Sequence, residues 1–432
     1  MRVLLISENR CRENLVPFPL GIACVASASR NAGHEVSALD LMFSSDPVKE
    51  TVERVREFRP HCIGLSIRNI DNQDMFNSEF YLPPLRELVR ALRAETDAPI
   101  VLGGAGFSIF PLQCLEYLDL EVGVVGEGER TFLELLRRLE NNANFDSLPG
   151  LAIRREGRSW VNPPAHYAWP GSFPPPDREL FDVRRYNSLP GGTPAYTANL
   201  QARRGCHMRC IYCTNPVIEG KAVRARPPSE VAEELAGLEA DHGIRYVIFT
   251  DSLFNYPQGY TLDLCREIAS RELSLRWWCT FNPLFCEPSV LEALREAGCV
   301  GLSIGNESGS EEILSALRKD FTRRHVVRSV SLAKELGLRT NCFLLLGGPG
   351  ENERTLRESL DLMLELAPDQ VTVTVGIRVY PGCELETLAL KRRAIEPGQN
   401  LLYPTFYLEP EVSSWIYPFM REFCAGHPGW VL

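Results

Sequence analysis

The stretch Gln201-Ala-Arg-Arg-Gly-Cys-His-Met-Arg-Cys-Ile-Tyr-Cys-Thr-Asn215 decides how the rest of the sequence is interpreted. It places Cys206, Cys210 and Cys213 within eight residues at C-x3-C-x2-C spacing, directly after a run typical of a β-strand. Three thiolates on one short loop suit an iron–sulfur cube. A [4Fe–4S] cluster normally takes four cysteines, so three leave one iron open to another ligand.

A structural zinc site is the main alternative for these thiols. Such a site has four closed protein ligands, and His207 is the candidate fourth. However, His207 adjoins Cys206, and no C-x2-C or H-x3-H pattern follows downstream. A disulfide framework is typical of short secreted chains, and neither the length nor the start of this sequence fits that class.

Length and composition limit the number of domains and the classes of protein to which the chain can belong. A chain of 432 residues predicts two or three domains. With 44% hydrophobic and 24% charged residues the composition is that of a globular protein, and a net charge of −10 argues against a nucleic-acid partner. No apolar run reaches the ~18 residues of a membrane span. The first residues lead straight into a strand pattern without an export signal, so we expect a cytoplasmic location and mostly reduced cysteines.

The first part of the chain alternates between strand and helix patterns. Because parallel strands joined by helices form a sheet covered on both faces, residues 1–142 predict a doubly wound domain with ligand loops at the carboxyl ends of its strands. Gly-rich turns follow two of those strands, although no G-x-G-x-x-G follows the first. The expected strands are residues 3–6, 36–41, 62–67, 100–102 and 122–125.

The remainder divides into three further segments. Residues 143–194 form a connector in which a hairpin around Glu156-Gly157 precedes proline-dense, extended chain. Residues 195–394 contain six strand–helix units, which predict a partial (β/α)6 barrel with its site at the carboxyl ends of the strands. Residues 395–432 form an aromatic-rich C-terminal segment that is either core or a cover for the barrel mouth.

Asp251 ends the second strand pattern of the barrel and is a candidate catalytic group. It is placed either toward the cavity or as the cap of the next element, since aspartate is a favoured capping residue.

The cysteine loop, with Gly205 before the first thiol and Tyr212 before the last, resembles that of the radical S-adenosylmethionine (radical SAM) superfamily. The resemblance implies that Cys206, Cys210 and Cys213 ligate the cluster and that SAM chelates the open iron. The first domain resembles the cobalamin (B12)-binding domain that precedes many radical SAM modules. Its resemblance lies in Pro19-Leu20-Gly21, Ala32-Gly-His-Glu-Val36, Gly103-Gly104 and Val125-Gly-Glu-Gly-Glu129.

The resemblance also implies which other residues bind the cofactors. Gly305-Asn-Glu-Ser-Gly-Ser310 resembles a G-x-E-S-G-S segment near SAM, with Glu307 also a candidate catalytic group and a helix cap as the alternative for its serines. Leu346-Gly-Gly-Pro-Gly-Glu351 resembles a turn beside adenine. The expected cofactor-binding residues are Tyr212, Glu307, Ser308, Gly347 and Glu351 for SAM, and Arg68, Asn69, Gly103, Gly104, Gly126 and Glu127 for cobalamin.

The sequence departs from the usual cobalamin-binding motif at the residue that would contact the lower face of the cobalamin. The sequence lacks D-x-H-x-x-G, so no histidine is evident as a lower axial ligand to cobalt. Arg68 is the candidate residue on that face, with pairing to Asp71 as the alternative. Cys383, after the sixth strand, is either an inert turn residue or a fourth thiol near the site.

Together these resemblances imply a cobalamin-dependent radical SAM enzyme that uses a [4Fe–4S] cluster, SAM and methylcobalamin. The leading expectation is a methyltransferase that C-methylates a small molecule, with a flavodoxin or ferredoxin as reductant. A rearrangement, ring contraction or cyclisation with the same cofactors is one alternative, and a polar methylation of an activated ring without a radical is another. A non-catalytic cobalamin- or metal-binding regulator is the alternative from another class.

Overall fold

The computed structural model describes residues 1–10, 16–164, 174–186 and 197–432. The chain forms two compact units. One comprises residues 1–72, 79–194 and 217–220, and the other residues 73–78, 195–216 and 221–432. The proline-dense parts of the expected connector at 165–173 and 187–196 lie outside the described residues.

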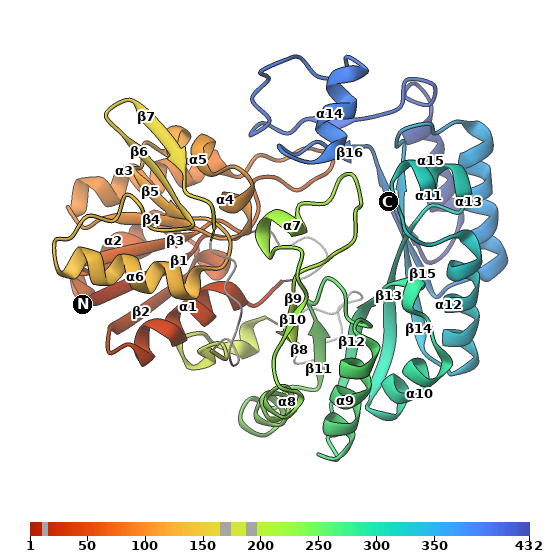
Figure 1. Cartoon of the computed structure of the whole chain (residues 1–432), viewed down its shortest axis with the longest axis horizontal. Helices are drawn as coiled ribbons and strands as arrows, with labels where there is room; N and C mark the ends of the chain where they lie inside the picture. The colour runs from red at the N-terminus through yellow and green to blue at the C-terminus, as the bar shows by residue number, and fades with distance from the viewer. Residues whose placement is uncertain (11–15, 165–173, 187–196) are drawn as a thin grey trace. The chain divides into compact units, whose positions relative to one another are not determined.

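The sheet of the first unit has five parallel strands in the order β2-β1-β3-β4-β5 (Figure 1). This is the flavodoxin-like order of doubly wound folds, so the predicted fold class is confirmed. Side chains of β1, which lies between β2 and β3, are buried on both faces, which explains its continuous apolar run. The strands are β1 (Arg2–Ser7), β2 (Glu35–Asp40), β3 (Cys62–Ser66), β4 (Ile100–Gly103) and β5 (Val122–Val124).

Helices cover both faces of this sheet. α1 packs beside α6 and α2 packs beside α3, as right-handed crossovers in this strand order require. The two short helices after β4 have no counterpart among the predicted elements. The helices are α1 (Leu20–Asn31), α2 (Pro47–Phe58), α3 (Leu82–Glu95), α4 (Ala105–Ile109), α5 (Pro111–Leu118) and α6 (Gly128–Glu140).

The hairpin expected in the connector is present as β6 (Leu151–Arg155) and β7 (Arg158–Val161). β6 pairs antiparallel with β5, so the hairpin extends the sheet of the first unit. Further along, Tyr186 donates a hydrogen bond to Asp40 at the end of β2. The described part of the connector therefore packs on the first unit.

The second unit is built on a sheet whose first six strands are parallel and follow chain order, β8-β11-β12-β13-β14-β15. This confirms the predicted partial barrel. β18 (Trp430–Val431) adds a seventh strand beside β15, so part of the aromatic C-terminal segment extends the sheet. The six strands are β8 (Thr197–Leu200), β11 (Tyr246–Phe249), β12 (Arg276–Phe281), β13 (Cys299–Glu307), β14 (Arg339–Leu346) and β15 (Gln370–Val375).

Helices follow the barrel strands along the chain. The second unit also contains two short antiparallel strand pairs, called ribbons here. Residues 73–78 also group with this unit, where the ring of Phe76 stacks on Tyr417 at 3.7 Å. The ribbons pair β9 (Arg203–Arg204) with β10 (Arg224–Ala225), and β16 (Ile377–Arg378) with β17 (Phe406–Tyr407). The helices are α7 (Asn215–Ile218), α8 (Pro228–His242), α9 (Gln258–Ala269), α10 (Pro288–Glu296), α11 (Glu311–Ala316), α12 (Arg323–Glu335), α13 (Glu353–Leu366), α14 (Glu384–Lys391) and α15 (Ile416–Gly426).

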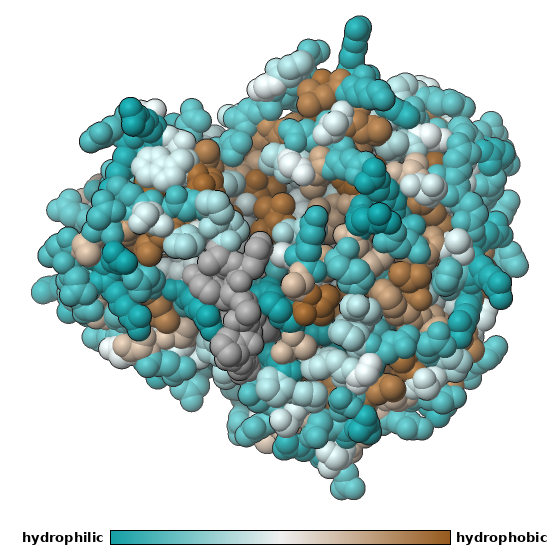
Figure 2. Space-filling model, viewed as in Figure 1, coloured by the Kyte–Doolittle hydropathy of each residue, from teal (hydrophilic) through white to brown (hydrophobic). Residues whose placement is uncertain are grey.

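Most residues on the face drawn in Figure 2 are hydrophilic. Within the described part of the chain, none of the helices is both long and apolar enough to cross a membrane.

Gly301 in β13 provides a test of the packing inside the barrel. A Cβ at this position would lie 2.0 Å from the ring of Trp278, whose indole N–H donates to Ser303 at 2.8 Å. Replacing Gly301 with alanine should therefore displace the ring and destabilise the protein by about 1–3 kcal/mol, measured by denaturant unfolding. Gly259→Ala is the matched control, because a Cβ there has no neighbour within 4 Å. Equal stability of the two variants would contradict this packing.

Candidate active site

The cysteine loop is anchored by a buried ion pair. Asp251, after β11, accepts hydrogen bonds from the Ala202 amide at 3.1 Å and from the Arg203 guanidinium at 3.3 Å. Burial raises the pKa of Asp251, and Arg203 opposes that rise. Asp251 thus fixes the backbone that enters the loop. Its expected catalytic role stays a prediction, and these contacts support a structural role instead.

Backbone hydrogen bonds hold the middle of the same loop. The Ile211 amide donates to the carbonyl of Leu317 after α11 at 3.3 Å, and the Ile211 carbonyl accepts from Leu385 at the start of α14 at 2.9 Å. The loop is therefore fixed by elements that follow β13 and β15, far away in sequence.

The role of the three thiols as cluster ligands stays a prediction, and the structure shows their surroundings. Cys206 packs with Met208 and Leu253, and Cys210 packs against the same group. Burial raises the pKa of Cys213 to about 12, and Cys210 and Cys206 add smaller increases. In the described residues no three acidic, thiol or imidazole side chains converge on one ion position. A cubane differs from a single ion, because its irons bind separate cysteines.

The other two candidate ligands, His207 and Cys383, have contacts of their own. The ring of His207, the fourth ligand of the zinc alternative, lies 4.6 Å from that of Tyr256 and 6.0 Å from that of Phe285. The Cys383 thiol donates to the Cys213 carbonyl at 3.4 Å, and burial raises its pKa to about 11. Cys383 thus lies beside the loop as a protonated hydrogen-bond donor.

Glu307 lies at the centre of a polar network beside the loop. Its Oε1 accepts from the Tyr212 hydroxyl at 2.9 Å and from the Lys319 ammonium at 3.2 Å. Burial, then the charge of Glu307, raise the pKa of Tyr212. Burial lowers the pKa of Lys319, but Glu307 and Cys210 outweigh it and raise that pKa above its ordinary value. Glu307 and Tyr212, both expected at the SAM site, are thus brought together.

Ser308 has a different environment. It is fully buried, and its hydroxyl shares a hydrogen bond of 2.8 Å with Ser359 of α13 and accepts from the Ser310 amide at 3.0 Å. Ser310, not Ser308, is the N-cap of α11, and its side chain makes no capping hydrogen bond, so these contacts are not those of a helix cap. A contact between Ser308 and SAM stays a prediction.

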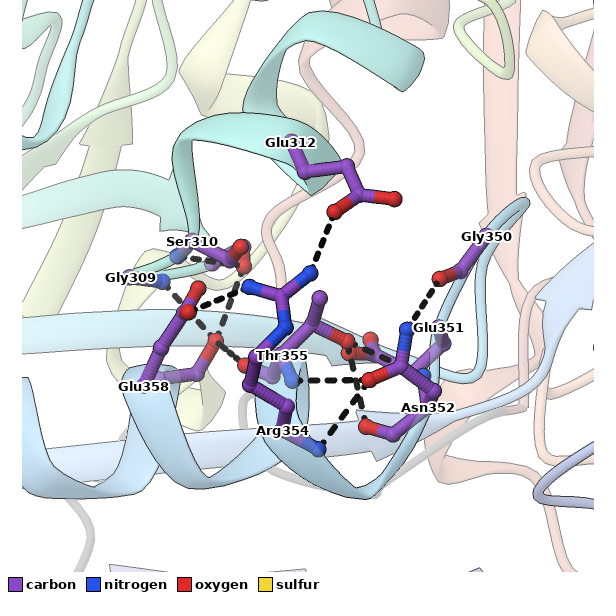
Figure 3. Close-up of polar contacts among 11 residues, drawn as sticks. Gly309, Ser310, Glu312, Gly350, Glu351, Asn352, Arg354, Thr355 and Glu358 are labelled. Carbon is purple, nitrogen blue, oxygen red and sulfur yellow. Dashed lines mark hydrogen bonds and ion pairs between the residues drawn. The ribbon is translucent and has the colours of Figure 1, made fainter.

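The turn after β14 is tied together by two carboxylates. Glu351 accepts from the Thr355 hydroxyl at 2.6 Å and from the Gly347 amide at 3.4 Å, and Figure 3 shows it at the start of α13. Glu409, in the C-terminal segment, accepts from the Gly350 amide at 2.7 Å, and its own amide donates to the Gly347 carbonyl at 2.9 Å. The turn expected beside adenine therefore has a fixed backbone.

In the first unit, two glycine turns meet at the carboxyl edge of the sheet. Gly104 has φ +95°, and a Cβ there would lie 2.4 Å from the carbonyl oxygen of Ile67. The Ser108 hydroxyl joins the turns, because it donates to the Gly104 carbonyl and accepts from the Gly126 amide, both at 2.8 Å. Gly103 ends β4 beside them. The loops expected to hold cobalamin thus form one surface.

The polar candidates lie on the loops at this edge. Arg68 is exposed and Asn69 half-buried after β3, whereas Asp71 is buried. Glu127 precedes α6. Glu8, which was not predicted, is buried at the end of β1, and burial raises its pKa to about 8 while Arg10 opposes the rise. The roles of Arg68, Asn69, Gly103, Gly104, Gly126 and Glu127 toward cobalamin stay predictions.

Comparison with known proteins gives the family. Residues 201–363 match the radical SAM superfamily, and residues 14–136 match the B12 binding domain. The chain therefore belongs to the radical SAM proteins that carry an N-terminal B12-binding domain. The cofactors of these two modules are a [4Fe–4S] cluster, SAM and cobalamin, as predicted.

Several proteins resemble the chain over most of its length. Tryptophan 2-C-methyltransferase of Streptomyces laurentii is 27% identical, with 88% of this chain and 73% of that protein covered. Cytidylyl-2-hydroxyethylphosphonate methyltransferase of Streptomyces wedmorensis is 23% identical, with 90% and 81% covered. The structure of the radical SAM methyltransferase TsrM from Kitasatospora setae, with cobalamin and a [4Fe–4S] cluster bound, superimposes with a TM-score of 0.86 at 24% identity, covering 100% and 92%.

The cluster assignment predicts the effect of removing each thiol. Replacing Cys206, Cys210 or Cys213 with alanine should reduce iron from about four per chain to nearly none after anaerobic reconstitution, because each anchors a different iron. Iron and sulfide analysis measures this. Cys383→Ala is the control and should retain its iron. Full iron loading of any loop variant would contradict the assignment.

Glu351 predicts a pH-dependent stability. Its pKa is raised from 4.5 to about 7 by burial, which the hydrogen bonds from Thr355 and Gly347 only partly offset. Between these values the unfolded chain ionises Glu351 while the folded chain keeps it protonated, so this group lowers the free energy of unfolding as pH rises. Below about 4.5 both states are protonated, and above about 7 the cost is constant.

The test compares denaturant unfolding of the native chain with that of Glu351→Gln across this range. The difference in unfolding free energy should shift in favour of the glutamine variant as pH rises. A difference that does not change with pH would contradict the raised pKa.

Proposed function

We propose that the chain is a cobalamin-dependent radical SAM methyltransferase that transfers a methyl group to a carbon of a small molecule. The observation that carries the proposal is the cysteine loop, fixed beside the Glu307–Tyr212–Lys319 network in a chain whose first unit has a B12-binding domain. The two methyltransferases that align with most of the chain support it.

Side chains of the protein would position the cluster and SAM. Cys206, Cys210 and Cys213 hold the cluster, and Glu307 presents a carboxylate oxygen for the SAM amino group. When bound, the cluster and SAM supply a hydrogen-abstracting radical and the cobalamin carries the methyl group.

The fixed turn at Gly347–Glu351 leaves a backbone surface for the adenine. In the first unit, the glycine turns at Gly104 and Gly126 let a broad planar ligand approach the backbone closely. Arg68, on the neighbouring loop after β3, would keep water away from the cobalt when cobalamin is bound. A cytoplasmic location and a flavodoxin- or ferredoxin-type reductant complete the proposal.

The substrate class is proposed from the relatives. One aligned protein is named for methylation of tryptophan and another for methylation of a cytidylyl phosphonate, so both act on small molecules. Tryptophan and simple indoles are the first substrates to test, because the tryptophan enzyme aligns with 88% of this chain.

The decisive experiment supplies the reconstituted protein with SAM carrying a deuterated methyl group, a reductant and tryptophan or an indole. We expect the label in a carbon-methylated product, together with S-adenosylhomocysteine, by mass spectrometry. The Cys210→Ala variant is the control and should give neither.

Other outcomes would reject the proposal. An altered product without the label would identify a rearrangement or cyclisation instead. Protein that is fully loaded with iron and cobalt, yet forms no SAM-derived product with any tested small molecule, would favour a regulator.

A further inference from the structure

Lys319, in the turn after α11, is a buried cation whose partners are unusual. Its side chain is only 7% exposed, and the rings of Tyr212 and Phe321 lie 5.5 Å from its nitrogen. An ammonium has three N–H donors. The three nearest acceptors are the Tyr212 hydroxyl at 3.0 Å, Glu307 Oε1 at 3.2 Å and the Cys210 sulfur at 3.7 Å.

We propose that Lys319 is a positioning residue that raises the reduction potential of the cluster, by placing a fixed positive charge and a hydrogen bond on the Cys210 thiolate. Reduction adds one electron from an external one-electron donor to the cluster, and no bond in the protein forms or breaks. A nearby cation favours the more negative, reduced state, and hydrogen bonds to cluster sulfurs act in the same direction.

The polar network determines which ammonium proton faces the Cys210 sulfur and how Glu307 acts on the reduction potential. Glu307 and Tyr212 hold two of the ammonium protons, which leaves the third for the sulfur. The carboxylate of Glu307 partly neutralises the ammonium, so the two residues should act in opposite directions on the potential. The inference rests on the cluster assignment within the proposed function but not on methyl transfer.

The test is a redox titration of the reconstituted holoprotein without SAM or substrate, followed through the electron paramagnetic resonance signal of the reduced cluster. In Lys319→Met the ratio of reduced to oxidised cluster at a fixed potential should fall about tenfold, equivalent to about 59 mV for a one-electron couple. Lys319→Arg keeps the charge and should stay close to the native potential.

Tyr212→Phe is the matched control, since it removes a hydrogen bond of the same network but keeps the ammonium. A native potential in Lys319→Met, or a fall no larger than in Tyr212→Phe, would overturn the proposal in favour of a structural role.

If Lys319→Met does not assemble a cluster, a second variant still tests the proposal. Glu307→Gln retains Lys319 and removes the opposing charge, so its potential should rise. An unchanged or lower potential there would overturn the proposal. Absence of a cluster in the native chain would instead reject the cluster assignment itself, which separates failure of this inference from failure of the methyltransferase proposal.

Discussion

The buried pair of Asp251 and Arg203 is the interaction on which the candidate site depends. A buried ion pair adds little net stability, because desolvation of both groups offsets their attraction. The role of the pair here is to fix the position of the backbone that enters the cysteine loop. Asp251 binds the Ala202 amide as well as the Arg203 side chain, so the chain leaves β8 in one direction, and the cysteine loop begins from a fixed point. Loss of one partner would leave a charge buried alone, at a cost of about 3–5 kcal/mol.

Parallel sheets explain why both candidate sites form at strand ends. All carboxyl ends of such strands meet at one edge, so residues distant in sequence become neighbours there. In the second unit this brings Tyr212, Glu307 and Lys319 together. In the first unit Ser108 connects the turns after β4 and β5 in the same way. The fold supplies proximity, and a few buried hydrogen bonds then fix the geometry.

The sequence predicted the strands well, because buried parallel strands are short apolar runs bounded by turns, as at Val3–Ile6. The cysteine loop was evident from its spacing alone. Lys319 could not be predicted, since a single lysine between two helical patterns is usually exposed, and only the folded partial barrel shows that it is buried beside Cys210. Ser308 and Asp251 were recognised as functional candidates, but their buried partners, Ser359 and Arg203, are visible only in three dimensions.

The contact between Glu409 and the turn at Gly347–Gly350 has a consequence for biosynthesis. Gly350 receives its carboxylate partner from a residue 59 positions later. A nascent chain that has already completed all six barrel strands still lacks this partner until residues 406–409 emerge from the ribosome. The turn at Gly347–Gly350 is therefore among the last parts of the protein to reach its final structure, and any ligand that needs this fixed backbone can bind only after the C-terminal segment has been made.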